Sequence, residues 1–286
     1  MKKLLAAAGL VVLATPAFAA DPTQPVEETV RQVSGYGQIY GGGLWISEFS
    51  DETLWAAGGA ARINVPFADR WNAQGDFTVD AVGQDGESLH GVGGAAHLFW
   101  RDPASYAFGG FVQANTYGSS SGLDADIWDW KVGPEAQAYF GNMTLYAQAY
   151  YGGLEADFLP FDVDLMGIRG VVRYFAQDNL RFDGELGFHR THLSVGGDSA
   201  DFDTIAAALQ ATYRFDGTPW SVFGRYQYEN ISFSEGGPGT DSLDSHKLMV
   251  GLRASFGSTT LIDEDRNGAT MDTYQPNFIM PLPFGG

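Results

Sequence analysis

The chain has 286 residues, with 35 acidic and 16 basic side chains, a formal net charge of −19 and no cysteine. A balance this acidic argues against nucleic acid as a partner, because binding to phosphates needs basic side chains. The lack of cysteine excludes disulfides, so packing and strand pairing must supply the stability.

Residues 1–20 have the three parts of a secretory signal peptide. Lys2 and Lys3 form a charged start, residues 4–13 are apolar, and Ala17-Phe18-Ala19 is a small-x-small cleavage site. The apolar run is too short for a spanning helix, so we expect cleavage after residue 19 or 20 rather than an uncleaved anchor. Residues 21–34 are polar and rich in proline at their start, which indicates a periplasmic lead-in.

From residue 35 onward, apolar and polar residues alternate with a period of two, which is the pattern of β-strands. We predict strands at Gly35–Ser47, Leu54–Val65, Trp71–Ala81, Leu89–Trp100, Tyr106–Tyr117, Ile127–Phe140, Met143–Gly153, Val163–Phe175, Leu180–Ser194, Thr204–Phe215, Trp220–Ile231 and Ser245–Phe256. Ten strands remain an alternative if the first or the eighth segment is misread.

The connections alternate in length. Short turn-forming sequences stand at 66–70, 101–105, 141–142, 176–179 and 216–219, and longer acidic or glycine-rich segments stand between them (GQDGES, GSSSGLDAD, LEADFLPFD and SFSEGGPGTDSLD). Short turns at one end and long loops at the other are typical of outer-membrane barrels, whereas a soluble β-sandwich has no reason to alternate.

Aromatic residues gather at the predicted strand ends. One set lies on the short-turn side (Trp71, Trp100, Tyr106, Phe140, Phe215, Trp220 and Phe256), and a looser set lies toward the long loops (Trp45, Trp55, Trp128, Trp130, Tyr150, Tyr151 and Tyr228). Rings of aromatic residues at two depths are typical of membrane interfaces. Because lipid offers backbone groups no partners, the sheet must close. We therefore predict an all-β fold, a closed antiparallel up-and-down transmembrane barrel over residues 35–256.

The closing segment Ser245–Phe256 carries Gly251, Leu252, Ala254 and a final Phe256. It resembles the last strand of Gram-negative outer-membrane β-barrel proteins, the porin-like small barrels. The resemblance implies an outer-membrane location and outer-membrane lipids as partners. It also implies that these four residues are an assembly signal read by the barrel-assembly machinery, with periplasmic chaperones acting during export. It leaves the oligomeric state open.

Charged residues on the polar faces are expected to line the lumen, because they would be costly toward lipid. They are Arg62, Asp76, Asp80, Glu135, Arg169, Arg173, Arg181, Asp183, Glu185, Arg214, Arg225, Glu229 and Arg253. Either they line a water-filled pore for small solutes or ions, or they pair and fill a plugged barrel that acts structurally or through its surface loops.

A third reading is a lipid hydrolase using His192 and Ser194, which share a strand face. Outer-membrane phospholipases carry an H-x-S-N-G motif, but here Val195 follows the serine and no asparagine follows closely. The remaining histidines do not have metal-ligand spacing. We expect no enzyme activity, no cofactor and no metal.

Residues 257–286 form a C-terminal tail beyond the closing strand, expected on the periplasmic side and outside the barrel wall. Asp263–Gly268 resembles half of a calcium loop, but Tyr274 stands where a glutamate is needed, which favours a simple turn. The apolar residues near the end predict docking of the last ten residues at the periplasmic mouth or in the lumen; the alternative is a disordered extension.

Overall fold

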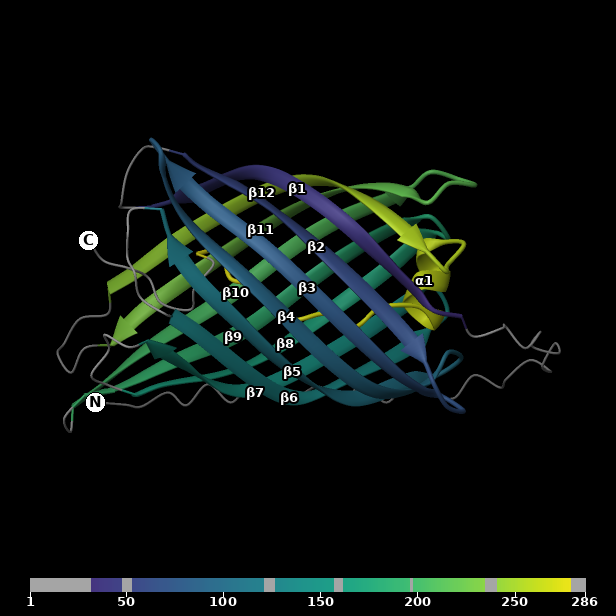
Figure 1. Cartoon of the computed structure of the whole chain (residues 1–286), viewed down its shortest axis with the longest axis horizontal. Coiled ribbons are helices and arrows are strands. Elements are labelled where there is room, and N and C mark those ends of the chain that lie inside the picture. Colours follow the sequence, from purple (N-terminus) through teal and green to yellow (C-terminus); the bar gives the residue numbers. More distant parts are fainter. Residues whose placement is uncertain are drawn as a thin grey trace, which may run out of the picture. The chain divides into compact units, whose positions relative to one another are not determined.

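The computed structural model describes residues 32–47, 53–120, 127–156, 162–195, 198–234 and 241–278. Within these ranges twelve strands form one closed antiparallel barrel (Figure 1). The strands are β1 (Ser34–Ile46), β2 (Leu54–Pro66), β3 (Trp71–Gln84), β4 (Glu87–Asp102), β5 (Tyr106–Ser119), β6 (Ile127–Phe140), β7 (Met143–Ala156), β8 (Asp162–Gln177), β9 (Leu180–Val195), β10 (Asp198–Arg214), β11 (Trp220–Ser234) and β12 (Asp241–Phe256).

Each strand pairs with its neighbour in sequence, and β1 pairs with β12 to close the sheet, with Gly35 opposite Phe256. Closure gives every strand two neighbours, so the wall has no edge to expose to lipid. Among the described residues, no helix has the length and apolar character to cross a membrane.

The predicted strands are confirmed, with ends shifted by a few residues, but two of the expected long connections are wrong. The sequence GQDGES forms a hairpin in which only Asp85 and Gly86 separate β3 from β4. Both have positive φ (50° and 92°), as a two-residue Asp-Gly turn requires. Likewise β9 reaches Val195 and β10 begins at Asp198, where a longer loop was expected. The alternation of short and long connections is therefore only partial.

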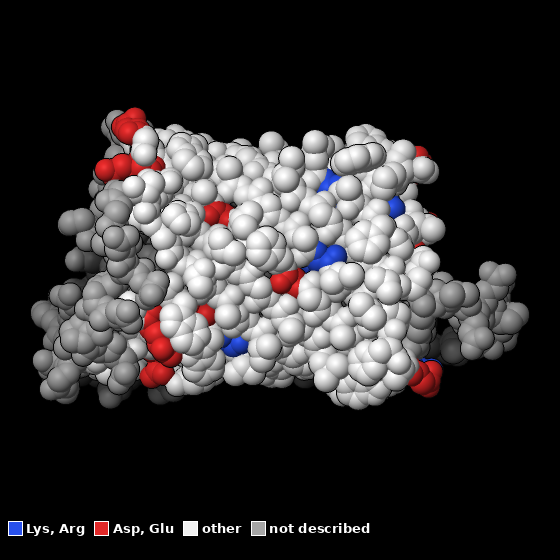
Figure 2. Space-filling view, in the orientation of Figure 1, with Lys and Arg blue, Asp and Glu red and all other residues white. Residues whose placement is uncertain are grey.

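The outward face of the wall is apolar. Ile39, Leu186, Leu209 and Val250 are each about two-thirds exposed, and charged atoms are sparse on the face of the wall drawn in Figure 2. The expected aromatic set at the short-turn end is also outward, including Tyr106, Phe140, Trp220 and Phe256. An exposed apolar band with aromatic ends is the surface that lipid requires. Of the set toward the long loops, Tyr150 is misassigned: it faces inward, and its hydroxyl lies 2.9 Å from His189 Nδ1.

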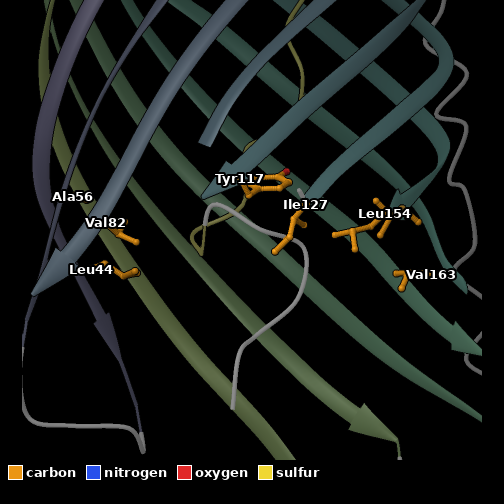
Figure 3. Packing of buried hydrophobic residues seen from close by; sticks show 8 residues of the cluster. Leu44, Ala56, Val82, Tyr117, Ile127, Leu154 and Val163 are labelled. Carbon is orange, nitrogen blue, oxygen red and sulfur yellow. The ribbon is translucent and has the colours of Figure 1, made fainter. Parts of the chain in front are cut away.

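The end of the barrel that carries the β2–β3, β4–β5, β6–β7, β8–β9 and β10–β11 connections is called here the short-turn end. Inside the barrel, apolar side chains cluster toward the opposite end. The cluster contains Leu44, Ala56, Val82, Tyr117, Ile127, Leu154, Val163 and Leu165, which lie near the ends of neighbouring strands (Figure 3). These residues point inward, on the face of the strands that is polar elsewhere. Whether an inward residue is polar or apolar therefore depends on its position along the strand as well as on the alternation.

After β12 the chain turns into the barrel. Gly257 has a φ of 70°, and a Cβ atom there would lie 2.2 Å from the carbonyl oxygen of Val33. Only glycine fits such a turn without strain. Helix α1 (Leu261–Asn267) follows at the short-turn end, and the chain beyond it runs inside the wall (Figure 1).

Candidate functional site in the barrel lumen

The lumen is occupied by the chain's own residues 257–278, called here the luminal segment. It enters at the short-turn end, where Arg214 at the end of β10 donates from Nη2 to the carbonyl oxygen of Ser258, 2.8 Å away. The segment therefore begins at the same end of the barrel at which β12 finishes.

Helix α1 is built by local signals and held by the wall. Thr260 caps it, accepting from the backbone N–H of Asp263 at 3.1 Å, and Asp263 and Glu264 stand in its first turn. Glu264 accepts from Arg253 Nη1 at 3.2 Å, and Asp265 accepts from Arg173 Nη1 at 2.8 Å. The helix thus turns two carboxylates toward arginines of the wall.

The calcium-loop reading of residues 263–268 is excluded, because most of that stretch lies in α1. Among the described residues, no group of three His, Asp or Glu side chains could hold a metal ion. The acidic residues of this stretch instead contact arginines.

From the helix onward, the segment advances along the inner face of β7. Asp265, in α1, accepts from Thr144 at 2.5 Å, and beyond the helix the carbonyl oxygen of Asp272 accepts from Tyr146 at 2.7 Å and from Gln148 at 3.0 Å. Thr144, Tyr146 and Gln148 are alternate residues, so the contacts move one inward position at a time away from the short-turn end.

Arg173 on β8 is the centre of this part of the interface. Its guanidinium donates to Asp265 (2.8 Å), to the hydroxyl of Thr270 (2.6 Å), to the carbonyl oxygen of Thr270 (3.0 Å) and to Asp272 (2.9 Å). Arg169, four residues earlier on the same face, forms a second ion pair with Asp272. Three positions of the segment are therefore tied to one wall arginine.

The segment then crosses to β11 and β12. Tyr274 donates to Glu229 and stacks on His189 with ring centroids 3.7 Å apart. Asn277 donates from Nδ2 to Ser245 Oγ at 3.0 Å, and Lys247 donates to the carbonyl oxygen of Asn277 at 3.3 Å. Because Ser245 pairs with Ile46, the last residue of β1, the segment reaches the far half of the barrel.

The charges of the segment are matched to the wall. Burial acts to raise the pKa of Asp265, but the charge of Arg173 and hydrogen bonds from Thr144 and Arg173 overcome it and lower the pKa below its ordinary value. The pKa of Asp272 is lowered in the same way, against burial, by Arg169 and Arg173. Both carboxylates are therefore held in the ionised form.

All of the charged residues predicted to line the lumen do point inward. Arg169, Arg173, Arg214, Glu229 and Arg253 contact the luminal segment. Others pair within the wall: Arg62 with Asp76 (2.7 Å), Arg181 with Asp183 (2.9 Å), Arg225 with Glu185 (2.9 Å), and Glu135 with His97 (2.9 Å). Asp80 accepts a hydrogen bond from Tyr40 at 2.7 Å.

The space left between the segment and the wall is small. A polar cavity of about 160 Å³ lies against β1–β3 and β8–β12. It is lined by wall residues, such as Arg181 and Arg225, and by segment residues, such as Asp272 and Gln275. Neighbouring inward side chains are closed off from solvent: Arg173 is 3% and Glu229 1% exposed.

Uncharged wall residues that were not predicted from the sequence also hold the segment. Gln74 donates to and accepts from the backbone of Met271 (2.7 and 3.2 Å), and Gln137 donates to Thr270. Gln227 donates to the carbonyl oxygen of Gln275 at 2.9 Å. The one feature of the sequence that could have indicated them is a glutamine at an inward-facing position of an alternating strand.

Of the two docking places expected for the end of the tail, the lumen is the one observed as far as Phe278. Residues 258–268 lie at the short-turn mouth, but residues 270–277 lie inside the wall and not beyond it. Residues 279–286 fall outside the described part of the chain. Residues 257–278 do not add a strand to the wall.

Two other predicted sets lie away from the lumen. Leu252 and Phe256 of the assembly signal are outward and about half exposed, whereas a Cβ at Gly251 would meet the ring of Phe223. Their role in assembly stays a prediction. His192 and Ser194 lie on the outward face of β9 near its far end.

Comparison with known proteins gives similarity of fold only. No family model matches the sequence, and no curated protein is similar to it in sequence. Among solved structures, an outer-membrane channel from Pseudomonas putida F1 superposes with a TM-score of 0.56 and 14% identity, over 83% of this chain and 100% of that one. The translocator domain of the autotransporter NalP from Neisseria meningitidis superposes with a TM-score of 0.50 and 14% identity, over 78% and 88%. The closed wall, its apolar outward face and these superpositions agree: this chain has the fold of the Gram-negative outer-membrane β-barrel proteins.

Proposed function

We propose that the protein is an outer-membrane channel that its own luminal segment closes at rest. Small ions or solutes pass only when residues 257–278 leave the lumen. On this proposal residues 1–20 are removed on export, and the barrel resides in the outer membrane. The channel named in the Pseudomonas putida structure supports the class, and the occupied lumen argues against a permanently open pore.

The observation that carries the proposal is the burial of inward polar side chains. In a water-filled pore, side chains such as Arg173 and Glu229 would be hydrated, yet each is at most 3% exposed and contacts the segment. A charge withdrawn from water needs a partner, and the segment supplies it. The wall and the segment are therefore complementary parts of one closed state.

The contacts suit a segment that can leave. Most are hydrogen bonds and ion pairs, which water can replace when the segment is released, so each contributes a modest net free energy, on the order of 1 kcal/mol. Met271 adds an apolar contact, because it belongs to one buried cluster with Phe99, Ala107, Tyr139, Tyr146 and Val171. One covalent connection, at Gly257, tethers the segment to the wall.

The charge distribution supports a preference for anions in the open state. Glu264, Asp265 and Asp272 neutralise Arg253, Arg173 and Arg169 in the closed barrel. Departure of the segment would leave Arg173 and Arg253 facing the lumen without a carboxylate, whereas Arg169 would keep Glu185 of the wall, 2.8 Å away. Rings of arginine in a pore favour anions.

Planar-bilayer recording of the full chain and of a variant lacking residues 258–286 tests both parts. We expect little steady current from the full chain and a steady current from the deletion variant. In a KCl gradient, the reversal potential of the deletion variant should shift toward the equilibrium potential of chloride. Heat-dependent gel mobility controls for folding of each barrel.

The outcomes separate the readings. A steady current of equal size from the full chain would overturn closure by the segment. A folded deletion variant without current would favour the second reading, a permanently filled barrel that acts structurally or through its surface. Cation selectivity in a conducting deletion variant would overturn the anion preference alone.

A further inference from the structure

A polar group of residues interrupts the outward face of β9 and β10 near the end opposite the short turns. The apolar band ends with Phe188 and Ile205, which pair across the two strands and are both exposed. The next outward pair is Arg190 and Asp203, joined by two hydrogen bonds of 2.6 and 2.7 Å. The pair after that is His192 and Asp201.

Three side chains of this group lie in the order nucleophile, base and carboxylate. The Oγ atom of Ser194 lies 3.2 Å from His192 Nε2, and His192 Nδ1 lies 2.6 Å from Asp201 Oδ1. If Nδ1–H donates to the carboxylate, Nε2 carries the lone pair that can accept the proton of the serine hydroxyl. This is the arrangement by which a histidine activates a serine for attack on a carbonyl carbon.

The strand register creates this arrangement. Ser194 and His192 are two residues apart on β9, so they share the outward face. Asp201 is directly opposite His192 on β10, nine residues further along the chain. The sequence shows no asparagine close behind the serine, and Asp201 was not considered because the short β9–β10 connection was not anticipated.

We propose that Ser194, His192 and Asp201 form a serine esterase site that hydrolyses fatty-acid esters of membrane lipids. The placement indicates the substrate: a lipid ester lies at the boundary between acyl chains and headgroup, and the site begins where the exposed apolar band gives way to charged residues. Ser194 is exposed and His192 and Asp201 are each about one-third exposed, so an ester can approach from the side of the bilayer. This site is independent of the lumen and of its closure.

The reaction needs only the lipid and water. Ser194 Oγ attacks the ester carbonyl carbon while its proton passes to His192 Nε2, and the carbonyl oxygen takes the electron pair. Collapse breaks the bond to the lipid alcohol, which leaves with the proton from Nε2, and the acyl group remains on Ser194. Water then attacks the acyl carbon, giving a proton to Nε2, and the fatty acid leaves as Ser194 regains that proton. One ester bond is cleaved and one water is consumed.

Asp201 acts through His192 and is a positioning residue. It fixes the tautomer and the orientation of the ring and stabilises the imidazolium form. Arg190 contributes to the placement of Asp201, since its Nη1 lies 3.8 Å from that carboxylate while the same guanidinium is held by Asp203.

The test uses the full-length protein in vesicles, with a fluorophosphonate probe that reacts with activated serines. We expect the wild-type protein to be labelled at Ser194, and Ser194→Ala to lose the label. The matched control is Ser199→Ala, because Ser199 lies directly across from Ser194 on β10 and should leave labelling unchanged. Heat-dependent mobility shows that each barrel is folded.

Release of fatty acid is then measured from vesicles of diacyl glycerophospholipid and from vesicles containing lipid A, which distinguishes the two ester sources. We expect hydrolysis of one of them, lost by at least about 10³-fold in Ser194→Ala. Asp201→Asn should lower kcat at an unchanged KM, and Asp201→Glu should restore part of it, which a purely structural carboxylate would not do. Absence of labelling and of fatty-acid release from the folded wild-type barrel would overturn the proposal and leave an ion-pair group at the membrane interface.

Discussion

Replacing Arg173 by methionine should release the luminal segment from a folded barrel. Arg173 is 3% exposed and joins Asp265, Thr270 and Asp272 to the wall. Methionine keeps much of the side-chain length but removes the charge and the donors. Asp265 is then left as a buried carboxylate without its main ion pair, whereas Asp272 keeps Arg169.

The size of the effect follows from breaking a buried ion pair by removing one partner, which costs about 3–5 kcal/mol. That cost falls on the docked state, because the released segment is hydrated. The released fraction should therefore rise by about 10²- to 10⁴-fold, since each 1.4 kcal/mol is a factor of ten.

The assay uses the lack of cysteine in the chain. Met271 is fully buried in the docked segment, so Met271→Cys gives one thiol that a soluble maleimide reaches only after release. The labelling rate then follows the released population. The control is Arg70→Met, because Arg70 pairs with Asp102 at the surface with 43% of its side chain exposed and should change the rate little. A folded Arg173→Met barrel that labels at the parent rate would refute the reasoning.

Two further substitutions should speed labelling of the same thiol reporter at residue 271, and a change of pH should not release it. Thr260→Ala removes the cap of α1, worth about 1 kcal/mol, and should speed labelling about fivefold. An unchanged rate would show that α1 does not contribute to docking of the segment. Gly257→Ala introduces a Cβ at positive φ, 2.2 Å from a carbonyl oxygen, and should speed labelling more than Thr260→Ala does while the barrel stays heat-modifiable; a slower rate than in Thr260→Ala would contradict the tight turn. Lowering the pH from 7 to 5 should not release the segment. The docked pKa of Asp265 is below its ordinary value, so its contribution is complete above that value and is lost only as the pH falls through the lowered pKa. A steep rise in labelling between pH 7 and 5 would show that another group controls docking.

The wall could be predicted because one physical rule, alternation between lipid and lumen, acts on almost every residue of it. In β3, for example, Phe77 and Val79 are outward and Asp76 and Asp80 inward, as their spacing required. The rule does not fix where strands end, so the hairpin at Asp85-Gly86 was taken as part of a long loop. Nor does the rule decide whether an inward position is polar, apolar or aromatic, as the inward Tyr150 shows.

The contents of the lumen and the outward polar site could not be derived in the same way. Residues 268–278 have no period, so nothing in them states which wall residues they meet, and the fit of Asp272 to Arg169 and Arg173 depends on the closed barrel. Asp201 is likewise placed beside His192 only by the β9–β10 register. Contacts between distant positions follow from assembly of the whole wall.

The central claim, that the luminal segment fills the barrel in the membrane, is tested most directly by cross-linking. Ser245→Cys with Asn277→Cys places two thiols where the native side chains are 3.0 Å apart, in a chain without other cysteines. The matched control is Leu248→Cys with Asn277→Cys, because Leu248 is on the opposite, outward face of β12 and 47% exposed. With a short bifunctional thiol-reactive cross-linker applied to outer membranes, we expect a cross-linked, heat-modifiable barrel from the first pair and no cross-link from the control. No cross-link from the first pair, or equal cross-linking from both, would contradict occupation of the lumen by this segment.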